Sequence, residues 1–128
     1  MNNYSYTDYV CPHCFKQLDK CDCEFQPWGL INIDSNIQEH IKILNEKGYV
    51  TTYCCESHDV NDGIYISFAC DYDIGSTISI PNGFVYRKSN SAIYYTYSKN
   101  ICDEEFQKQK NEQLKILLKW CLELPCRN

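Results

Sequence analysis

The chain has 128 residues, a formal net charge of −5 and a pI of about 5.1, and 44% of its residues are hydrophobic. This length and composition predict a single domain, 1–128, with one modest core. No apolar run reaches about 18 residues, so no membrane-spanning helix is expected. Because phosphate backbones are bound by clustered Lys and Arg, an acidic chain is also a poor candidate for direct nucleic-acid binding.

Ten cysteines are the most informative feature of the composition. The first eight residues contain neither the basic nor the apolar part of an export signal, so a cytoplasmic location and reduced thiols are expected. The strongest motif is Cys11-Pro-His-Cys14 followed by Cys21-Asp-Cys23. Two closely spaced cysteine pairs can place four soft donors at the tetrahedral corners that zinc prefers. Segment 9–27 is therefore predicted to be a loop that binds a structural Zn²⁺ ion; free thiols and disulfides are the alternatives. The predicted ligands are Cys11, Cys14, Cys21 and Cys23.

The segment 34–124 is predicted to form an α-β-β-β-β-α body, and its first element is a helix over 34–47. Ser35 and Gln38 have the spacing of a capping box, and Gly48 fits the left-handed position just after a helix end. An apolar stripe with helical spacing supports the assignment. It consists of Ile37, Ile41 and Leu44.

Four strands and a second helix follow. β-branched and aromatic residues predict strands at 49–54 and 64–68, which pair as a hairpin, and a second hairpin at 83–87 and 92–97. The last helix is predicted over 103–124, before Pro125. This order predicts an α+β fold, with a four-stranded antiparallel sheet flanked by two helices.

A second chemical motif, Cys54-Cys55-Glu56-Ser57-His58, lies at the end of the first predicted strand. Three interpretations are open. Cys54, Cys55 and His58 could form a second metal site together with Cys70, or Cys55 and His58 could be a thiol–imidazole pair for catalysis. The third is purely structural, because a cysteine in a strand is often a small buried hydrophobe.

Acidic residues are concentrated between Lys47 and Arg87, where the sequence has neither Lys nor Arg. One interpretation is a solvated surface that keeps the protein soluble. The other is a surface that steers the protein towards a basic partner, with exposed tyrosines of the strand 92–97 adding contact area. The candidate partner-binding residues are Glu56, Asp59, Asp62, Asp71 and Asp73.

The cysteine-rich head, the segment 44–58, the strand 65–68 and the tail 117–125 together resemble a group of small, mostly uncharacterised zinc proteins. These are encoded by low-GC bacteria, their phages and mobile elements. The pattern of that group has Gly where this chain has Ser57. Because the relatives look like phage and mobile-element cargo, the resemblance implies a counter-defence role, and the chain looks like a candidate type II anti-CRISPR protein.

The leading hypothesis is therefore a non-enzymatic, zinc-stabilised inhibitor that docks on a host protein with a basic surface. A Cas9-type nuclease, with its basic channel for the guide–target duplex, is the expected partner. The alternative is a small enzyme or ligand-binding protein that uses the Cys55/His58 region. A zinc-dependent nucleic-acid reader is a third and weaker hypothesis, since the negative charge argues against it.

Overall fold

The computed structural model describes residues 9–10 and 31–127. Apart from Tyr9 and Val10, the predicted zinc loop 9–27 and its ligands Cys11, Cys14, Cys21 and Cys23 lie outside the described residues. The described elements are β1 (Tyr9–Val10), β2 (Ile31–Asn32), α1 (Gln38–Glu46), β3 (Thr51–Cys55), β4 (Ile64–Phe68), β5 (Val85–Arg87), the 3₁₀ turn η4 (Lys88–Asn90), β6 (Ala92–Tyr95) and α2 (Asp103–Glu123).

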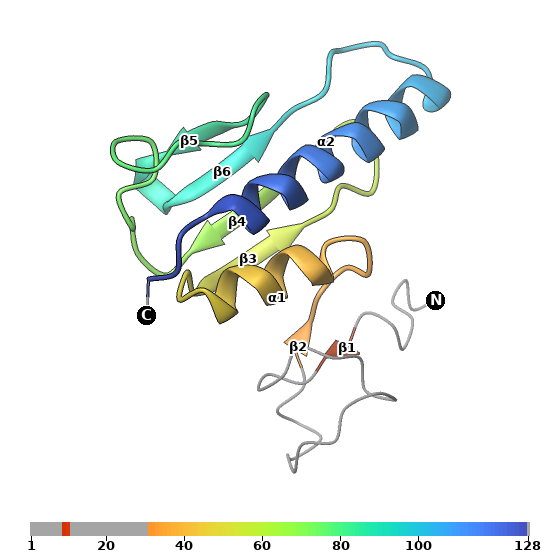
Figure 1. Cartoon of the computed structure of the whole chain (residues 1–128). Helices are drawn as coiled ribbons and strands as arrows, with labels where there is room; N and C mark the ends of the chain where they lie inside the picture. Colours follow the sequence, from red (N-terminus) through yellow and green to blue (C-terminus); the bar gives the residue numbers. More distant parts are fainter. Residues whose placement is uncertain (1–8, 11–30, 128) are drawn as a thin grey trace.

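A four-stranded antiparallel sheet, with strand order β3-β4-β6-β5, forms the centre of the fold. The strands β3 and β4 form one hairpin and β5 and β6 the other, and the two hairpins join where β4 pairs with β6. Both helices cover the same face of this sheet (Figure 1). The predicted α+β fold with two hairpins and two helices is confirmed. The short strands β1 and β2 form a separate antiparallel pair.

The first helix begins later than the sequence indicates. Its N-cap is Ile37, which has no side-chain capping hydrogen bond. The side chain of Gln38 donates to the carbonyl of Ile33 at 2.9 Å. Residues 34–37 form a turn, closed by the Ile37 amide donating to the Asp34 carbonyl at 3.1 Å. The side chain of Asp34 is therefore placed just before the helix.

The core lies between the sheet and the two helices. The predicted stripe of α1 is buried, as are Leu117 and Cys121 on α2. Lys47 fixes the far end of α2, because its Nζ donates to the last carbonyls of that helix, including Leu122 at 2.7 Å and Leu124 at 2.6 Å. A cation placed at a helix C-terminus also complements the helix dipole. The two helices are thus joined at this end by a polar contact as well as by packing.

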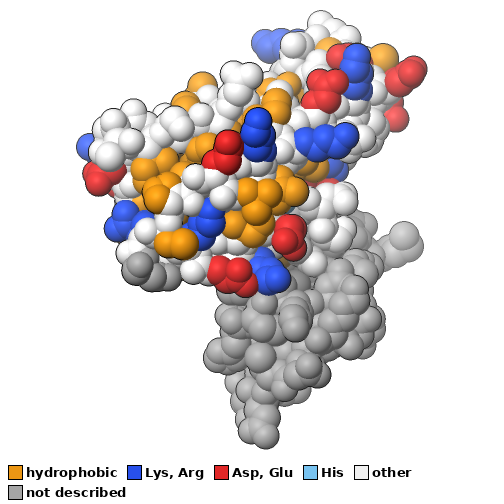
Figure 2. All heavy atoms as spheres, viewed as in Figure 1, with side chains coloured by type: hydrophobic (Ala, Val, Ile, Leu, Met, Phe, Trp, Pro, Cys, Tyr) orange, Lys and Arg blue, Asp and Glu red, His pale blue; other side chains and the backbone are white. Residues whose placement is uncertain are grey.

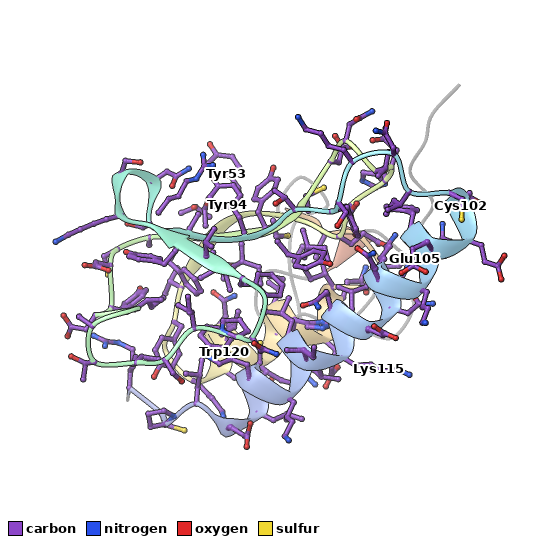
Figure 3. The ribbon with its side chains drawn as sticks, turned by 90° about the horizontal axis from the view of Figure 1, so that it is seen from above. Tyr53, Tyr94, Cys102, Glu105, Lys115 and Trp120 are labelled. Carbon is purple, nitrogen blue, oxygen red and sulfur yellow. The ribbon has the colours of Figure 1, made fainter. Side chains whose placement is uncertain are left out.

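The two faces of the sheet carry different tyrosines, as period-two alternation predicts. Tyr95 packs against the core, and its ring centroid lies 5.2 Å from that of Tyr97. Tyr94 lies opposite Tyr65 on the paired strand, with ring centroids 5.9 Å apart. Figure 3 shows Tyr94 and Tyr53 on the side of the sheet away from the helices. One sheet face therefore packs on the helices, while phenol rings project from the other.

On the face shown in Figure 2, Lys and Arg side chains are interspersed with Asp and Glu over the helices. This mixture of charges gives the pictured face no single sign. Among the described residues, no helix has the length and apolar character needed to cross a membrane.

Candidate metal centre

Three side chains with metal-ligating atoms meet at the end of β3. Asp34, Cys55 and His58 each offer one donor atom, and the three atoms lie within 4.8 Å of one another. Donors bound to one zinc ion lie about 2.0–2.3 Å from it, and hence about 3–4 Å from one another. The His58 side chain is 57% exposed. The donor atoms of Asp34 and His58 already lie 3.2 Å apart, within this range, and the exposed imidazole can turn about its side-chain bonds.

Asp34 reaches the site from the turn before α1. Its carboxylate oxygen Oδ2 accepts a hydrogen bond from the backbone amide of Glu56 at 3.1 Å. The same oxygen lies 3.2 Å from Nε2 of His58. The Asp34 side chain is only 11% exposed, so the carboxylate is held in place rather than free in solvent. Asp34 thus contacts Glu56 and His58, which lie more than twenty positions further along the sequence.

The turn after β3 brings Cys55 and His58 to the same side. Ser57, which lies between them, is fully buried and has φ 79°, a left-handed conformation that glycine adopts most readily. The Ser57 hydroxyl lies 3.0 and 2.5 Å from the carbonyl oxygens of Asp59 and Asp62 and shares its single proton between them. These bonds hold the non-glycine residue in its strained conformation. The Ser57 amide also donates to the Cys55 sulfur at 3.3 Å.

Burial raises the pKa of the Cys55 thiol, and the nearby carboxylates of Asp34, Asp62 and Glu56 raise it further. The hydrogen bond from the Ser57 amide opposes this shift without reversing it. Without a cation, the thiol is therefore protonated at neutral pH. A divalent ion reverses this preference, because metal coordination deprotonates a thiol and attracts the same carboxylates.

The raised pKa separates the two chemical interpretations of the site. A cysteine nucleophile must be a thiolate, and catalytic cysteines lie in electropositive surroundings that lower the thiol pKa. Here Cys55, His58 and Asp34 have the residue types of a nucleophile, a base and an orienting acid. The electrostatic field around the Cys55 sulfur, however, is negative. This environment favours a metal centre over nucleophilic catalysis. Three protein ligands leave a fourth tetrahedral position open, as in zinc sites that bind a further ligand.

The structure also decides which cysteines can share this site. Cys54 faces the opposite side of β3 from Cys55 and packs against the core, and burial raises its thiol pKa to about 12. Cys70 follows Phe68, which pairs with Thr51, whereas Cys55 pairs with Tyr65 at the opposite end of the hairpin. The proposed grouping of Cys54 and Cys70 with Cys55 and His58 is therefore wrong. The third residue of the candidate group is Asp34.

Glu56 is not part of an exposed acidic surface, as the sequence had indicated, but is 5% exposed. The Asn36 amide donates to Oε1 at 3.0 Å, and the Asn36 side chain donates to Oε2 at 2.7 Å. Lys110 on α2 lies 2.8 Å from Oε2. Burial by itself raises the pKa of Glu56, but the hydrogen bonds from Lys110 and Asn36 outweigh it and hold the pKa below its usual value. Glu56 thus joins α2 and the turn before α1 to the loop that carries the site.

The remaining candidate partner-binding residues are divided between two places. Asp59 and Asp62 are exposed in the loop between β3 and β4, beside His58, whereas Asp71 and Asp73 follow the other end of β4. A five-residue strand is about 16 Å long, about twice the Debye length at physiological salt. The predicted set therefore does not form one acidic surface.

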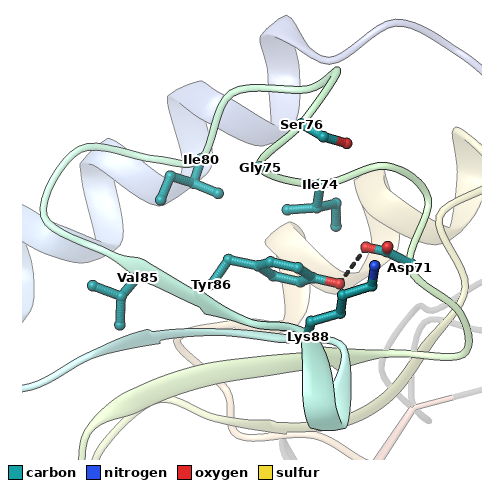
Figure 4. Close-up of a pocket in the computed structure, with 8 residues that line it drawn as sticks. All are labelled: Asp71, Ile74, Gly75, Ser76, Ile80, Val85, Tyr86 and Lys88. Atoms are coloured by element: carbon teal, nitrogen blue, oxygen red, sulfur yellow. Dashed lines mark hydrogen bonds between the residues drawn. The ribbon is translucent and has the colours of Figure 1, made fainter.

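Asp71 is half-buried and accepts a hydrogen bond from the Tyr86 hydroxyl. This pair lies in an open hollow of about 500 Å³, shown in Figure 4. Lys88 extends beside the pair, and apolar side chains form much of the remaining wall. Asp71 is thus an internal hydrogen-bond acceptor in the structure. The apolar residues are Ile74, Ile80 and Val85.

Comparison of the chain with protein-family models, with curated proteins and with solved structures finds no match. The resemblance noted from the sequence therefore remains an expectation, and the site has to be interpreted from its own chemistry.

Sequence reasoning found Cys55 and His58 but missed Asp34. Cys55 and His58 belong to one short motif that is visible in the sequence, whereas Asp34 was assigned to the first turn of a helix. The polar run before an apolar helical stripe indicates that helix equally well when it starts at Gln38. No local signal distinguishes an aspartate that begins a helix from one that points back towards a distant strand.

Proposed function

We propose that this chain is a zinc-binding protein that holds one Zn²⁺ ion with Asp34, Cys55 and His58, in addition to the predicted cysteine-rich site of segment 9–27. The observation that carries the proposal is the meeting of the three donor atoms within 4.8 Å. An oxygen, a sulfur and a nitrogen donor form a set that zinc accepts, and the Asp34 carboxylate is already held by the Glu56 amide.

Metal analysis tests the zinc proposal directly. Protein purified without chelators should contain about two zinc ions per chain, one for each site. The Cys55→Ser and His58→Ala variants should each lose about one ion, because a three-ligand site tolerates no missing donor. Cys70→Ser is the matched control, since Cys70 is an exposed cysteine at the other end of the hairpin. An unchanged zinc content in both Cys55→Ser and His58→Ala would remove the proposed centre.

We further propose that the protein acts by binding a host protein with a basic surface rather than by catalysis. A Cas9-type nuclease is the partner we favour, on the resemblance to phage and mobile-element proteins. One observation supports binding through the loop between β3 and β4, and a second argues against catalysis. Asp59 and Asp62 are exposed there, and the environment of Cys55 disfavours a thiolate nucleophile. Complementary charge would then speed the encounter with a basic channel.

Charge reversal in this loop tests the binding proposal. The double variant Asp59→Lys, Asp62→Lys should associate more slowly with a Cas9-type nuclease, and the difference should shrink as salt rises. Asp73→Lys, at the other end of β4, is the control and should change the rate little. The measurement is made with and without guide RNA. Absence of binding to any such nuclease would discard this partner, whereas unchanged association at low salt would discard the role of the loop.

A further inference from the structure

A small hollow adjoins the candidate metal centre. It has a volume of about 250 Å³ and lies between the loop after β3 and the beginning of α2. His58 belongs both to this hollow and to the metal-ligating group. Since drug-sized ligands occupy about 300–1,000 Å³, a hollow of this volume suits a smaller molecule. Its other lining residues are Asp59, Val60, Ile101, Asp103, Phe106 and Gln107.

The position of His58 connects the ion to the hollow. A zinc ion bound to a ring nitrogen of His58 would lie about 2.0–2.1 Å from an imidazole that forms part of the wall. Three protein ligands leave one coordination position open. Because His58 is the ligand that also lines the hollow, we place the open position on the side of the hollow.

The charges of the site select the kind of molecule. The Asp34 carboxylate and the Cys55 thiolate neutralise the two positive charges of the ion. The exposed carboxylates of Asp59 and Asp103 add two negative charges at the hollow. The N-terminus of α2, where Asp103 lies, and the Asn61 and Asp62 amides that donate to Oδ1 of Asp59 offset only part of this charge. A cation is attracted to such a site, while an anion is repelled. The apolar side chains of Val60 and Phe106 suit a short apolar segment of a ligand, between the group that binds the metal and the group that carries the positive charge.

We infer that the hollow binds a small organic cation whose neutral nitrogen donor completes the coordination of the metal. An imidazole or amine nitrogen is the donor, and an ammonium group faces Asp59 and Asp103. The inference rests on the proposed metal centre, and it adds a ligand class to that centre.

Histamine is a suitable probe, because it joins an imidazole to an ammonium group. The full-length protein is loaded with Co²⁺, which replaces zinc and gives visible absorption bands. The bands that are lost in the Cys55→Ser variant belong to the Asp34–Cys55–His58 centre. Histamine should shift these bands saturably. The neutral analogue 4-methylimidazole should bind about fivefold more weakly, as expected for the loss of exposed charge pairs, and imidazole-4-acetate more weakly still.

Asp103→Asn is the variant that tests the ammonium contact, since Asp103 is exposed and is not a metal ligand. It should weaken histamine binding about fivefold and leave both the cobalt bands and the affinity for 4-methylimidazole unchanged. Asp73→Asn, an exposed aspartate outside the hollow, is the control.

The outcomes separate the ligand proposal from the metal proposal. If Cys55→Ser loses no cobalt bands, the metal centre itself is refuted. If the bands are present but histamine leaves them unchanged or removes the cobalt, the ligand site is refuted and the metal centre stands. Equal binding of histamine and 4-methylimidazole would overturn the assignment of a cationic ligand.

Discussion

Replacing Lys110 with Met should destabilise the protein strongly, because it leaves the buried carboxylate of Glu56 without its cation. The two side chains are 12% and 7% exposed, so solvent cannot substitute for the lost contact. Removing one partner of a buried pair costs about 3–5 kcal/mol. Asn36 still donates to both carboxylate oxygens, which reduces the cost. We expect a loss of about 2–3 kcal/mol in the free energy of unfolding at neutral pH, in the range of a hydrogen bond to a charged group.

The effect should depend on pH in a defined direction. Because the folded-state pKa of Glu56 lies below its usual value of 4.5, the unfolded state takes up this proton first as the pH falls. The stability that Asn36 and Lys110 give to the ionised Glu56 is complete above about pH 4.5, and it is lost as the pH falls through the folded-state pKa of Glu56. Lys110→Met should therefore cost much less at about pH 3 than at neutral pH.

Urea unfolding followed by tryptophan fluorescence measures the free energy of unfolding at neutral pH and at about pH 3. Lys115→Met is the matched control, because Lys115 is an exposed lysine on the same helix (Figure 3) and Lys and Met have similar helix propensities. Adding Glu56→Gln to Lys110→Met should recover part of the lost stability, since no buried charge remains. An equal loss for Lys110→Met and Lys115→Met, or a loss that does not change with pH, would refute the role assigned to the ion pair.

Three further predictions concern other parts of the fold. Gly63→Ala should lower the free energy of unfolding, measured in urea, by about 1–3 kcal/mol, because the added Cβ would collide with the backbone carbonyl of Tyr95. An unchanged free energy of unfolding would contradict the close packing of the β3–β4 turn on β6. Burial lowers the pKa of His40, whose Nε2–H donates to the Leu114 carbonyl at 2.8 Å, so the free energy of unfolding should fall as the pH drops below 6.5. His40→Gln should flatten this pH dependence, and an equally steep dependence in the variant would contradict the role assigned to His40. In metal-free protein, the raised thiol pKa predicts that Cys55 reacts with iodoacetamide more slowly than the exposed Cys70, as measured by mass spectrometry; faster labelling of Cys55 would favour the nucleophile interpretation.

The sequence by itself determined the secondary structure, because that information is local. Strand β4 coincides with the predicted 64–68, and α2 falls within the predicted 103–124. Alternation along 92–97 placed Tyr94 and Tyr95 on opposite faces, and Gly48 marked the end of α1 with φ 94°. Each of these features depends on residues within a few positions of one another, so periodicity and turn chemistry are enough to find it.

Only the tertiary structure decided what the polar residues do. Glu56 looks like its exposed acidic neighbours in the sequence, but Asn36 and Lys110 surround it in the fold. In the same way, Asp34 meets Cys55 and His58 only because α1 packs beside β3 and the turn before the helix points towards the end of that strand. The sheet order that joins the two hairpins through β4 and β6 is also a long-range choice. Such contacts depend on how the apolar faces of separate elements pack together, and no residue's own neighbours in the chain encode them.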